Sequence, residues 1–170
     1  MENPIIATLD SYKIRKGLSE DQILQLIEYS SSDTDVGKFT TDSSRFKDRA
    51  GFDEFSTHIL AYYVLVDNSD KLLGIIWFDD FIVKELPVGY RISFAIRLYG
   101  EARGKGLAQE FSEKAMEDFK KSEEYKSHPH PKLWLSVSPE NEPAVSLYRK
   151  LGFKDLEINE EYHKLLMIKD

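Results

Sequence analysis

The sequence "YRISFAIRLYGEARGKGLAQEF", residues 90–111, contains a strand pattern, a glycine-rich turn and the start of a helix in direct succession. Before the turn, apolar residues alternate with polar or small ones, which is typical of a strand with one buried face. That face consists of Tyr90, Ile92, Phe94, Ile96 and Leu98. After the turn, apolar residues recur every four positions, as on one face of a helix. These residues are Leu107, Phe111, Ala115 and Phe119.

Two glycines, Gly104 and Gly106, lie in the turn beside Arg103 and Lys105. Glycine lets the backbone approach a ligand without a Cβ in the way. The first amides of a helix are unpaired and carry a partial positive charge, so the turn suits a phosphate or pyrophosphate. The same glycines would also suit an ordinary tight connection. A dinucleotide-binding G-x-G-x-x-G pattern fits poorly because Gln109 stands in place of the third glycine, and the G-K-[ST] sequence of an ATP-binding loop is absent.

The whole chain is interpreted as a single α/β domain of residues 1–170. A helix is expected after Leu18, because Ser19 and Gln22 have the spacing of a capping box. Residues 30–56 lack a clear periodicity and are interpreted as loop, with room for a short helix near residues 43–50. Further strands are expected at residues 59–66, 72–78, 133–138 and 163–169, and another helix within residues 141–153.

Composition and charge narrow the classes of partner. The chain is 41% hydrophobic and 31% charged, as in globular rather than disordered proteins. A net charge of −7 argues against a nucleic-acid partner and is favourable to a cationic one such as an amine. The sequence lacks a membrane-spanning apolar run and a signal-peptide pattern, so no membrane partner is expected. The absence of cysteine excludes disulfides and thiolate metal sites and suits a cytoplasmic location.

Two motifs in order resemble the GNAT superfamily of N-acetyltransferases. Arg103, Gly106 and Ala108 match the family pattern [Q/R]-x-x-G-x-[G/A], and "NEPAVSLYRKLGF" places Asn141 and Tyr148 at the family's later positions. The resemblance covers roughly residues 61–168. It implies a mixed central sheet of about six to seven strands flanked by helices. In that sheet, the strands ending "FAIRL" and "LWLSVS" are expected to be parallel neighbours that splay apart around acetyl-CoA.

The resemblance also implies which residues bind acetyl-CoA. The pantetheine arm is expected to add to the splayed strand through main-chain hydrogen bonds of Ile96, Arg97 and Leu98. The pyrophosphate is expected on the glycine turn, with Asn141 near the pantetheine and Tyr148 near the thioester sulfur. The full implied set is Ile96, Arg97, Leu98, Arg103, Gly104, Lys105, Gly106, Leu107, Ala108, Gln109, Asn141 and Tyr148.

In the implied reaction a neutral amine attacks the acetyl thioester. Tyr148 is the expected general acid for the departing thiolate, while packing in the apolar stripe of its helix is the alternative role. The general base is unassigned, because this chain has Ser93 and Ser136 on the strands where many family members carry a glutamate. The remaining candidates are Asp79, Asp80 and Glu85, and a chain of ordered water is the alternative.

The remaining conspicuous residues receive structural interpretations. His128 and His130 lie in "HPHP" without obvious partner ligands, so no metal site is expected. Trp134 alternates with leucines in a strand and is expected to pack in the core. An aromatic group is either core or part of an acceptor pocket; it consists of Phe39, Phe46, Phe52, Phe55, Trp77 and Phe78.

Three functions remain open at this point. The favoured one is an acetyl-CoA-dependent N-acetyltransferase whose acceptor is a small-molecule or peptide amine. The second is a non-catalytic acyl-CoA-binding sensor or regulatory module of the same fold. The third is an unrelated phosphate-binding α/β domain. The sequence specifies neither the acceptor nor the oligomeric state, and a homodimer is compatible with it.

Overall fold

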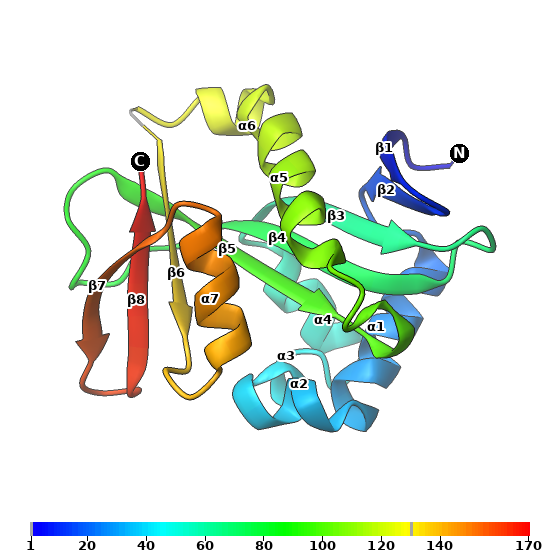
Figure 1. The fold of residues 1–170 in the computed structure, drawn as a ribbon, viewed down its shortest axis with the longest axis horizontal. Helices are drawn as coiled ribbons and strands as arrows, with labels where there is room; N and C mark the ends of the chain where they lie inside the picture. The colour runs from blue at the N-terminus through cyan, green and yellow to red at the C-terminus, as the bar shows by residue number, and fades with distance from the viewer. Residues whose placement is uncertain (1, 130) are drawn as a thin grey trace.

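The computed structural model describes residues 2–129 and 131–170, so His130 lies outside the described residues. Within them, eight strands form one mixed sheet in the order β1-β2-β3-β4-β5-β6-β8-β7 (Figure 1). The strands are β1 Ile5–Leu9, β2 Tyr12–Lys16, β3 Ile59–Val66, β4 Leu72–Asp80, β5 Tyr90–Leu98, β6 Lys132–Val137, β7 Lys154–Asn159 and β8 Lys164–Lys169. The expected mixed sheet flanked by helices is confirmed, with eight strands where the sequence indicated six to seven.

Three strands were not identified from the sequence, namely β1, β2 and β7. β1 and β2 form an antiparallel hairpin at one end of the sheet, with Asp10 of the connecting turn in the left-handed region (φ 51°). β7 forms the opposite edge and pairs only with β8 along its length. β1 and β7 are largely exposed, so neither needs the apolar alternation that marks a buried strand.

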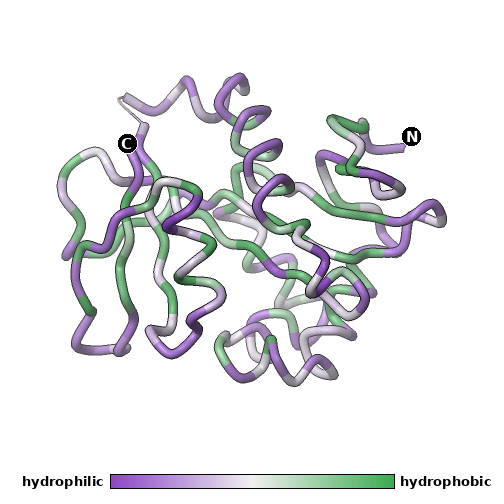
Figure 2. The backbone as a smooth tube through the Cα atoms, in the orientation of Figure 1, coloured by the Kyte–Doolittle hydropathy of each residue, from purple (hydrophilic) through white to green (hydrophobic). Residues whose placement is uncertain are grey.

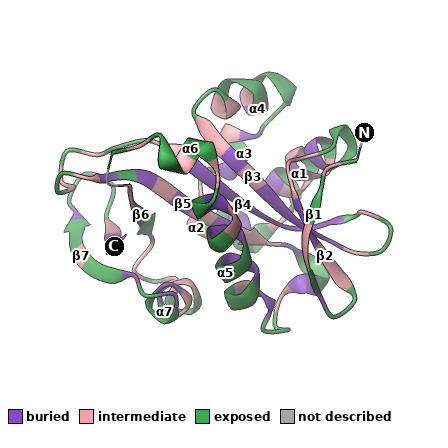
Figure 3. Cartoon of the chain, turned by 90° about the horizontal axis from the view of Figure 1, so that it is seen from above, coloured by how far each residue is buried: buried purple, intermediate pink, exposed green. Residues whose placement is uncertain are grey.

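Helices cover both faces of the sheet (Figure 3). One face carries α5 Leu107–Lys120 and α7 Glu142–Lys150, and the short α6 Glu123–Lys126 follows α5. The other carries α1 Glu20–Ser32, α2 Thr34–Phe39, α3 Asp42–Arg45 and α4 Arg49–Ser56. Successive strand residues enter opposite cores, so Phe78 packs toward α5 and Trp77 packs toward α3 and α4. The central strands accordingly form the hydrophobic segments in Figure 2.

Residues 30–56 are mainly helical, which corrects the expectation of a loop. The caps are local: Asp33 accepts from the amide of Val36 (3.1 Å), and Asp48 accepts from that of Gly51 (2.8 Å). These helices have four to eight residues, too few to produce a readable periodicity.

The aromatic residues of this segment belong largely to the core. Phe46 and Phe52 are 0% and 5% exposed and pack against the face of the sheet that carries Trp77. Phe78 is fully buried on the opposite face, whereas Phe39 and Phe55 are half-buried. Trp134 is buried as expected, and its indole N–H donates to the carbonyl of Phe81 (2.8 Å). Phe46 and Phe52 are therefore core residues, which is one of the two interpretations that the sequence allowed.

The parallel pair in the middle of the sheet is β5 and β6. Their pairing ends where Ser93 lies opposite Trp134. β5 then continues to Leu98 and β6 to Val137, so the strands part over their C-terminal residues. The splayed pair expected from the sequence is thus present, and we call the space between the two strand ends the gap.

Candidate functional site

The glycine turn leads into α5 through two residues with left-handed backbone. Gly104 has φ 71° and Gly106, the N-cap of α5, has φ 70°. A Cβ at either position would meet no described atom within 4 Å, so the space around the turn is open. No described side chain caps the first amides of the 14-residue α5. Unpaired amides at the start of a helix form a binding site for an anion.

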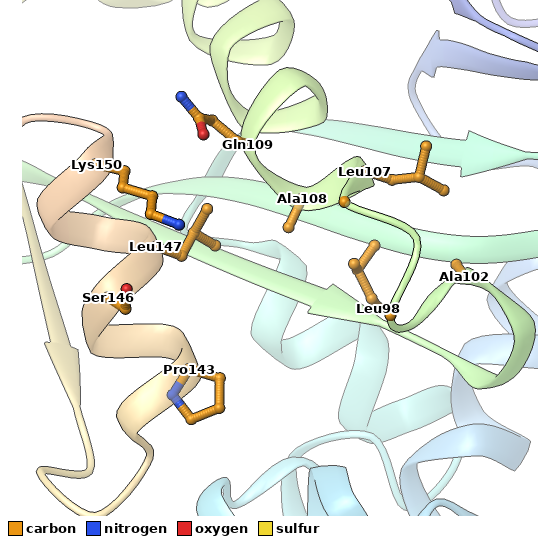
Figure 4. A pocket seen from close by; sticks show the side chains of 11 residues that line it. Leu98, Ala102, Leu107, Ala108, Gln109, Pro143, Ser146, Leu147 and Lys150 are labelled. Carbon is orange, nitrogen blue, oxygen red and sulfur yellow. The ribbon is translucent and has the colours of Figure 1, made fainter.

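A cavity of about 360 Å³ lies between this turn, the end of β5 and α7 (Figure 4). Six residues expected to bind the cofactor line it: Leu98, Gly104, Gly106, Leu107, Ala108 and Gln109. The other lining residues were not expected from the sequence; they are Ala102, Pro143, Ser146, Leu147 and Lys150. The last four, at positions 143, 146, 147 and 150, have the spacing of one helix face and share the face of α7 toward α5, where Lys150 adds positive charge (Figure 4). That spacing is visible in the sequence, but it does not say which helix the face meets.

The main chain of β5 points alternately toward β4 and toward the gap. Just after the C-terminal end of β5, the amide of Tyr99 donates to the carbonyl of Leu73, at the start of β4 (2.9 Å). Near the N-terminal end of β5, the amide of Phe81 donates to the carbonyl of Arg91 (3.2 Å). Main-chain direction alternates along a strand, so the odd-numbered residues 91–99 face β4 and the even-numbered ones face the gap.

Ile96 and Leu98 therefore present their N–H and C=O groups to the gap, beyond the last pairing with β6. An extended ligand with amide groups could add there as a strand. Arg97 faces β4 with its main chain, opposite Ile75. This orientation does not favour the expected main-chain contact of Arg97 with the cofactor.

The Arg97 side chain joins β5 to α3. Its Nε and Nη2 donate to the two carboxylate oxygens of Asp42 (2.7 and 3.1 Å), and Asp42 is 0% exposed. Its Nη1 donates to the carbonyl of Ile96 (2.9 Å), one of the groups that face the gap. The guanidinium also lies over the ring of Trp77, 4.9 Å from its centroid. A paired arginine thus closes the gap on the side of α3.

The two basic side chains of the turn are engaged outside the cavity. Arg103 donates to Asp33 (2.8 Å) and Asp35 (3.3 Å) at the junction of α1 and α2. Lys105 donates to the hydroxyl of Tyr12 on β2 (2.9 Å). Neither lines the cavity, so the turn offers its amides, and the side chains anchor it to the N-terminal part of the chain.

Asn141 is the N-cap of α7 and accepts weakly from the amide of Ala144 (3.4 Å). With Pro143 in the first turn of the helix, this cap sets where α7 begins. Asn141 is next to the cavity in sequence but does not line it.

Tyr148 lies on α7 and is 6% exposed. Its ring packs edge-on against Phe94 of β5 and Phe153, with centroids 6.3 and 6.1 Å away. Burial raises the pKa of the hydroxyl, and the positive charge of Arg97 opposes this. A hydroxyl that keeps its proton near neutral pH can serve as a proton donor.

The three candidate bases have different surroundings. Asp80 accepts from Nε of Arg91 (2.7 Å), and this hydrogen bond lowers the pKa of the carboxyl. Glu85 accepts from the side-chain amide of Asn159 (2.7 Å). Asp79 is half-buried on β4, and its Oδ1 is enclosed without a hydrogen-bond partner among the described residues. Asp79 is therefore the candidate whose carboxylate is not already committed to another side chain.

The described residues contain no cluster of three or more histidine, aspartate or glutamate side chains that could hold a metal ion. His128 instead contacts the carbonyl of Glu124 through Nδ1 (2.7 Å). Nor is any helix among the described residues both long and apolar enough to cross a membrane.

Solved structures with the same fold are numerous. The ribosomal-protein-S5-alanine acetyltransferase from Vibrio fischeri superposes with a TM-score of 0.69 at 15% identity, covering 96% of this chain and 93% of that one. The spermidine N-acetyltransferase from Vibrio cholerae, solved with CoA and spermine, gives 0.68 at 16% identity, with 94% of both chains covered. A GNAT-family acetyltransferase from Streptococcus pneumoniae gives 0.64 at 19% identity, covering 93% and 98%. At these identities the likeness shows the fold alone.

No protein of curated function matches this sequence significantly. Residues 17–154, however, match the family described as the acetyltransferase (GNAT) domain. The match extends from before α1 to the start of β7 and so includes the glycine turn, the splayed strands and α7. The chain therefore belongs to the GNAT acetyltransferase family.

Proposed function

We propose that this protein is an N-acetyltransferase that moves the acetyl group of acetyl-CoA to a primary amine by direct attack. The observation that carries the proposal is the end of β5, at Ile96 and Leu98, which β6 does not pair with and which is followed, after the short helical turn of residues 100–102, by the open glycine turn. A ligand with an amide-containing arm and a pyrophosphate would satisfy both features at once. Acetyl-CoA has that chemistry and an activated acetyl group as well.

The pyrophosphate would bind the first amides of α5, with Gly104 and Gly106 allowing close approach. Lys150 would approach the phosphates from α7 across the cavity. The pantetheine amides would pair with Ile96 and Leu98, replacing the contacts that β6 no longer makes. This would place the thioester deep in the gap, near Phe94 and Tyr148.

The acceptor nitrogen must lose a proton before it can attack. An alkylamine with a pKa of about 10.4 pays roughly 4.6 kcal/mol for deprotonation near pH 7. After attack, the bond from the carbonyl carbon to sulfur breaks and the thiolate takes a proton. Tyr148 is the proposed donor, because its buried hydroxyl stays protonated and its ring lies against the strand that borders the gap.

A primary amine, small or in a peptide, is the proposed acceptor class. The net charge of −7 favours a cationic partner. Two of the structural neighbours are a spermidine N-acetyltransferase and an acetyltransferase named for an alanine of a ribosomal protein. The fold is thus compatible with both a polyamine and a peptide amine. We keep the cytoplasm as the proposed location, because the chain has no cysteine to oxidise.

The direct test is release of free CoA from acetyl-CoA in the presence of an amine panel of spermidine, butylamine and an alanyl peptide. Release that depends on one of these amines supports the proposal. Calorimetry with acetyl-CoA is measured in parallel. Binding without release from any amine would instead indicate a non-catalytic acyl-CoA sensor, and absence of binding would contradict the site itself.

A further inference from the structure

The geometry points to Asp79 as the group that takes the proton from the acceptor ammonium in the acetyl transfer. This assignment rests on the proposed function and deepens it. Asp79 lies near the end of β4, on the strand next to the splayed pair, rather than on either splayed strand. It would supply the acid–base group for which Ser93 and Ser136 offer no carboxylate.

The position of Asp79 along the sheet places it beside the gap. It lies directly opposite Ser93 of β5, and Ser93 forms the last pair with β6 before the strands part. Adjacent strands are about 4.8 Å apart, so a single strand, β5, separates Asp79 from the point where the gap begins. The pairing of β3 with β4 is also irregular next to Asp79, where Leu60 is skipped. Such irregularities bend the strand that carries the extra residue, here β3, and are common beside active sites.

Asp79 lies on the face of the sheet that carries α1 to α4. α5 and α7 cover the opposite face, where the glycine turn and the cavity receive the cofactor. Trp77, two residues before Asp79 on the same side of β4, packs against Phe46 and Phe55. Asp79 thus points toward α3 and α4, on the side of the sheet away from the cavity proposed for the cofactor.

The surroundings of Asp79 are suited to a proton acceptor. Its Oδ1 is enclosed and makes no hydrogen bond among the described residues. Burial raises the pKa of Asp79 to about 6, with the charges of His58 and Arg45 acting to lower it and that of Asp80 acting to raise it. Tyr62 of β3 is the other titratable group that faces it, and Ser93 is its uncharged neighbour on β5. Asp79 is therefore ionised near neutral pH but more basic than an ordinary aspartate.

The proton balance is simple. The ammonium gives one proton to the Asp79 carboxylate, directly or through one water, and the free amine attacks the thioester carbon. The new carbon–nitrogen bond forms, the carbon–sulfur bond breaks, and the second nitrogen proton passes to the departing thiolate by way of Tyr148. Asp79 then returns its proton to solvent, so each turnover releases one amide, one CoA thiol and one proton.

The experiment compares Asp79→Asn with Asp80→Asn, its neighbour on the opposite side of β4, which pairs with Arg91. CoA release is measured from about pH 6 to pH 10 with the best amine of the panel of spermidine, butylamine and alanyl peptide. We expect Asp79→Asn to lower kcat/KM about 10²-fold near pH 7, the low end of general base catalysis. The loss should shrink as the pH rises toward the acceptor's pKa, because a growing fraction of the amine has already lost its proton to solvent. Asp80→Asn should stay within about twofold of the parent, and acetyl-CoA affinity should be unchanged in both.

Several results would overturn the assignment. One is an Asp79→Asn variant with near-parental turnover near pH 7, and another is a loss that is equal at every pH, as for a structural defect. Calorimetry on the same samples shows whether the variant is folded and binds acetyl-CoA. If the parent shows no CoA release that depends on an amine, the proposed function fails and the assignment of Asp79 fails with it. If the parent is active and only the Asp79 comparison fails, the proposed function stands without this base.

Discussion

Replacing Gly106 by valine tests whether the glycine turn binds the cofactor. Gly106 has φ 70°, where an L-residue costs roughly 1–2 kcal/mol. A Cβ there would meet no described atom within 4 Å, so the substitution creates no steric clash at the Cβ with the described residues. For a chain of this size, the strain should lower Tm by roughly 2–8 °C. The side chain would instead occupy the space where the pyrophosphate must approach, and acetyl-CoA affinity should fall at least tenfold, about 1.4 kcal/mol.

Gly100→Val provides the matched control for this substitution. Gly100 also has a left-handed backbone (φ 45°) and open space around its missing Cβ, but it does not line the cavity. Both variants should therefore lose comparable stability in a melting curve, while only Gly106→Val should lose affinity in calorimetry. A folded Gly106→Val protein that binds acetyl-CoA like the parent would refute the assignment of the turn. Equal affinity losses in both variants would attribute the effect to backbone strain.

Three further substitutions test other parts of the structure. Tyr148→Phe keeps the ring packing and removes the proposed donor, so kcat should fall about 10²-fold with little change in acetyl-CoA affinity; turnover within twofold of the parent would leave Tyr148 as a packing residue. Asp42→Asn leaves the Arg97 guanidinium without its buried charged partner and should lower the free energy of unfolding, measured in urea, by about 3–5 kcal/mol. As a control, Asp80→Asn removes one partner of an exposed ion pair and should lower it by less than about 1 kcal/mol. Asp79→Asn should change the pH dependence of stability: the folded-state pKa is raised from 3.8 to about 6, so the parent loses stability as pH rises through that window. The Asp79→Asn variant should therefore have a higher Tm than the parent above about pH 6 and the same Tm below about pH 4. A variant with a lower Tm than the parent at neutral pH would contradict the burial of an unpaired charge at Asp79.

The parts of the fold with a strong local pattern could be predicted from the sequence. The alternation of residues 90–98, the glycines of the turn and the four-residue repeat of α5 report burial and backbone geometry directly. The Ser19–Gln22 capping box is likewise present as expected. Apart from the short helix allowed near residues 43–50, the helices of residues 30–56 were not predicted, because they are short and their stability comes from packing on the sheet rather than from periodicity.

The site was predicted less completely than the fold, for a physical reason. Motif spacing locates the turn, but it does not say which way a strand's peptide groups point or which face of α7 meets α5. Arg97 therefore received a main-chain role that its orientation toward β4 does not favour. Lys150 was overlooked because a lysine at the end of a helix is ordinary in sequence. Asp79 and Asp80 are adjacent in the sequence, but the strand pleat directs their side chains to opposite faces of the sheet. Asp80 binds Arg91, whereas Oδ1 of Asp79 has no hydrogen-bond partner among the described residues.

The central claim is that this protein joins the acetyl group of acetyl-CoA to an amine nitrogen. Mass spectrometry of the acceptor after reaction with acetyl-CoA deuterated in its acetyl group tests this most directly. The account predicts an amide that carries the intact labelled acetyl group, formed in equal amount to the CoA released. CoA released together with labelled acetate and an unchanged amine would show hydrolysis instead and would contradict the account.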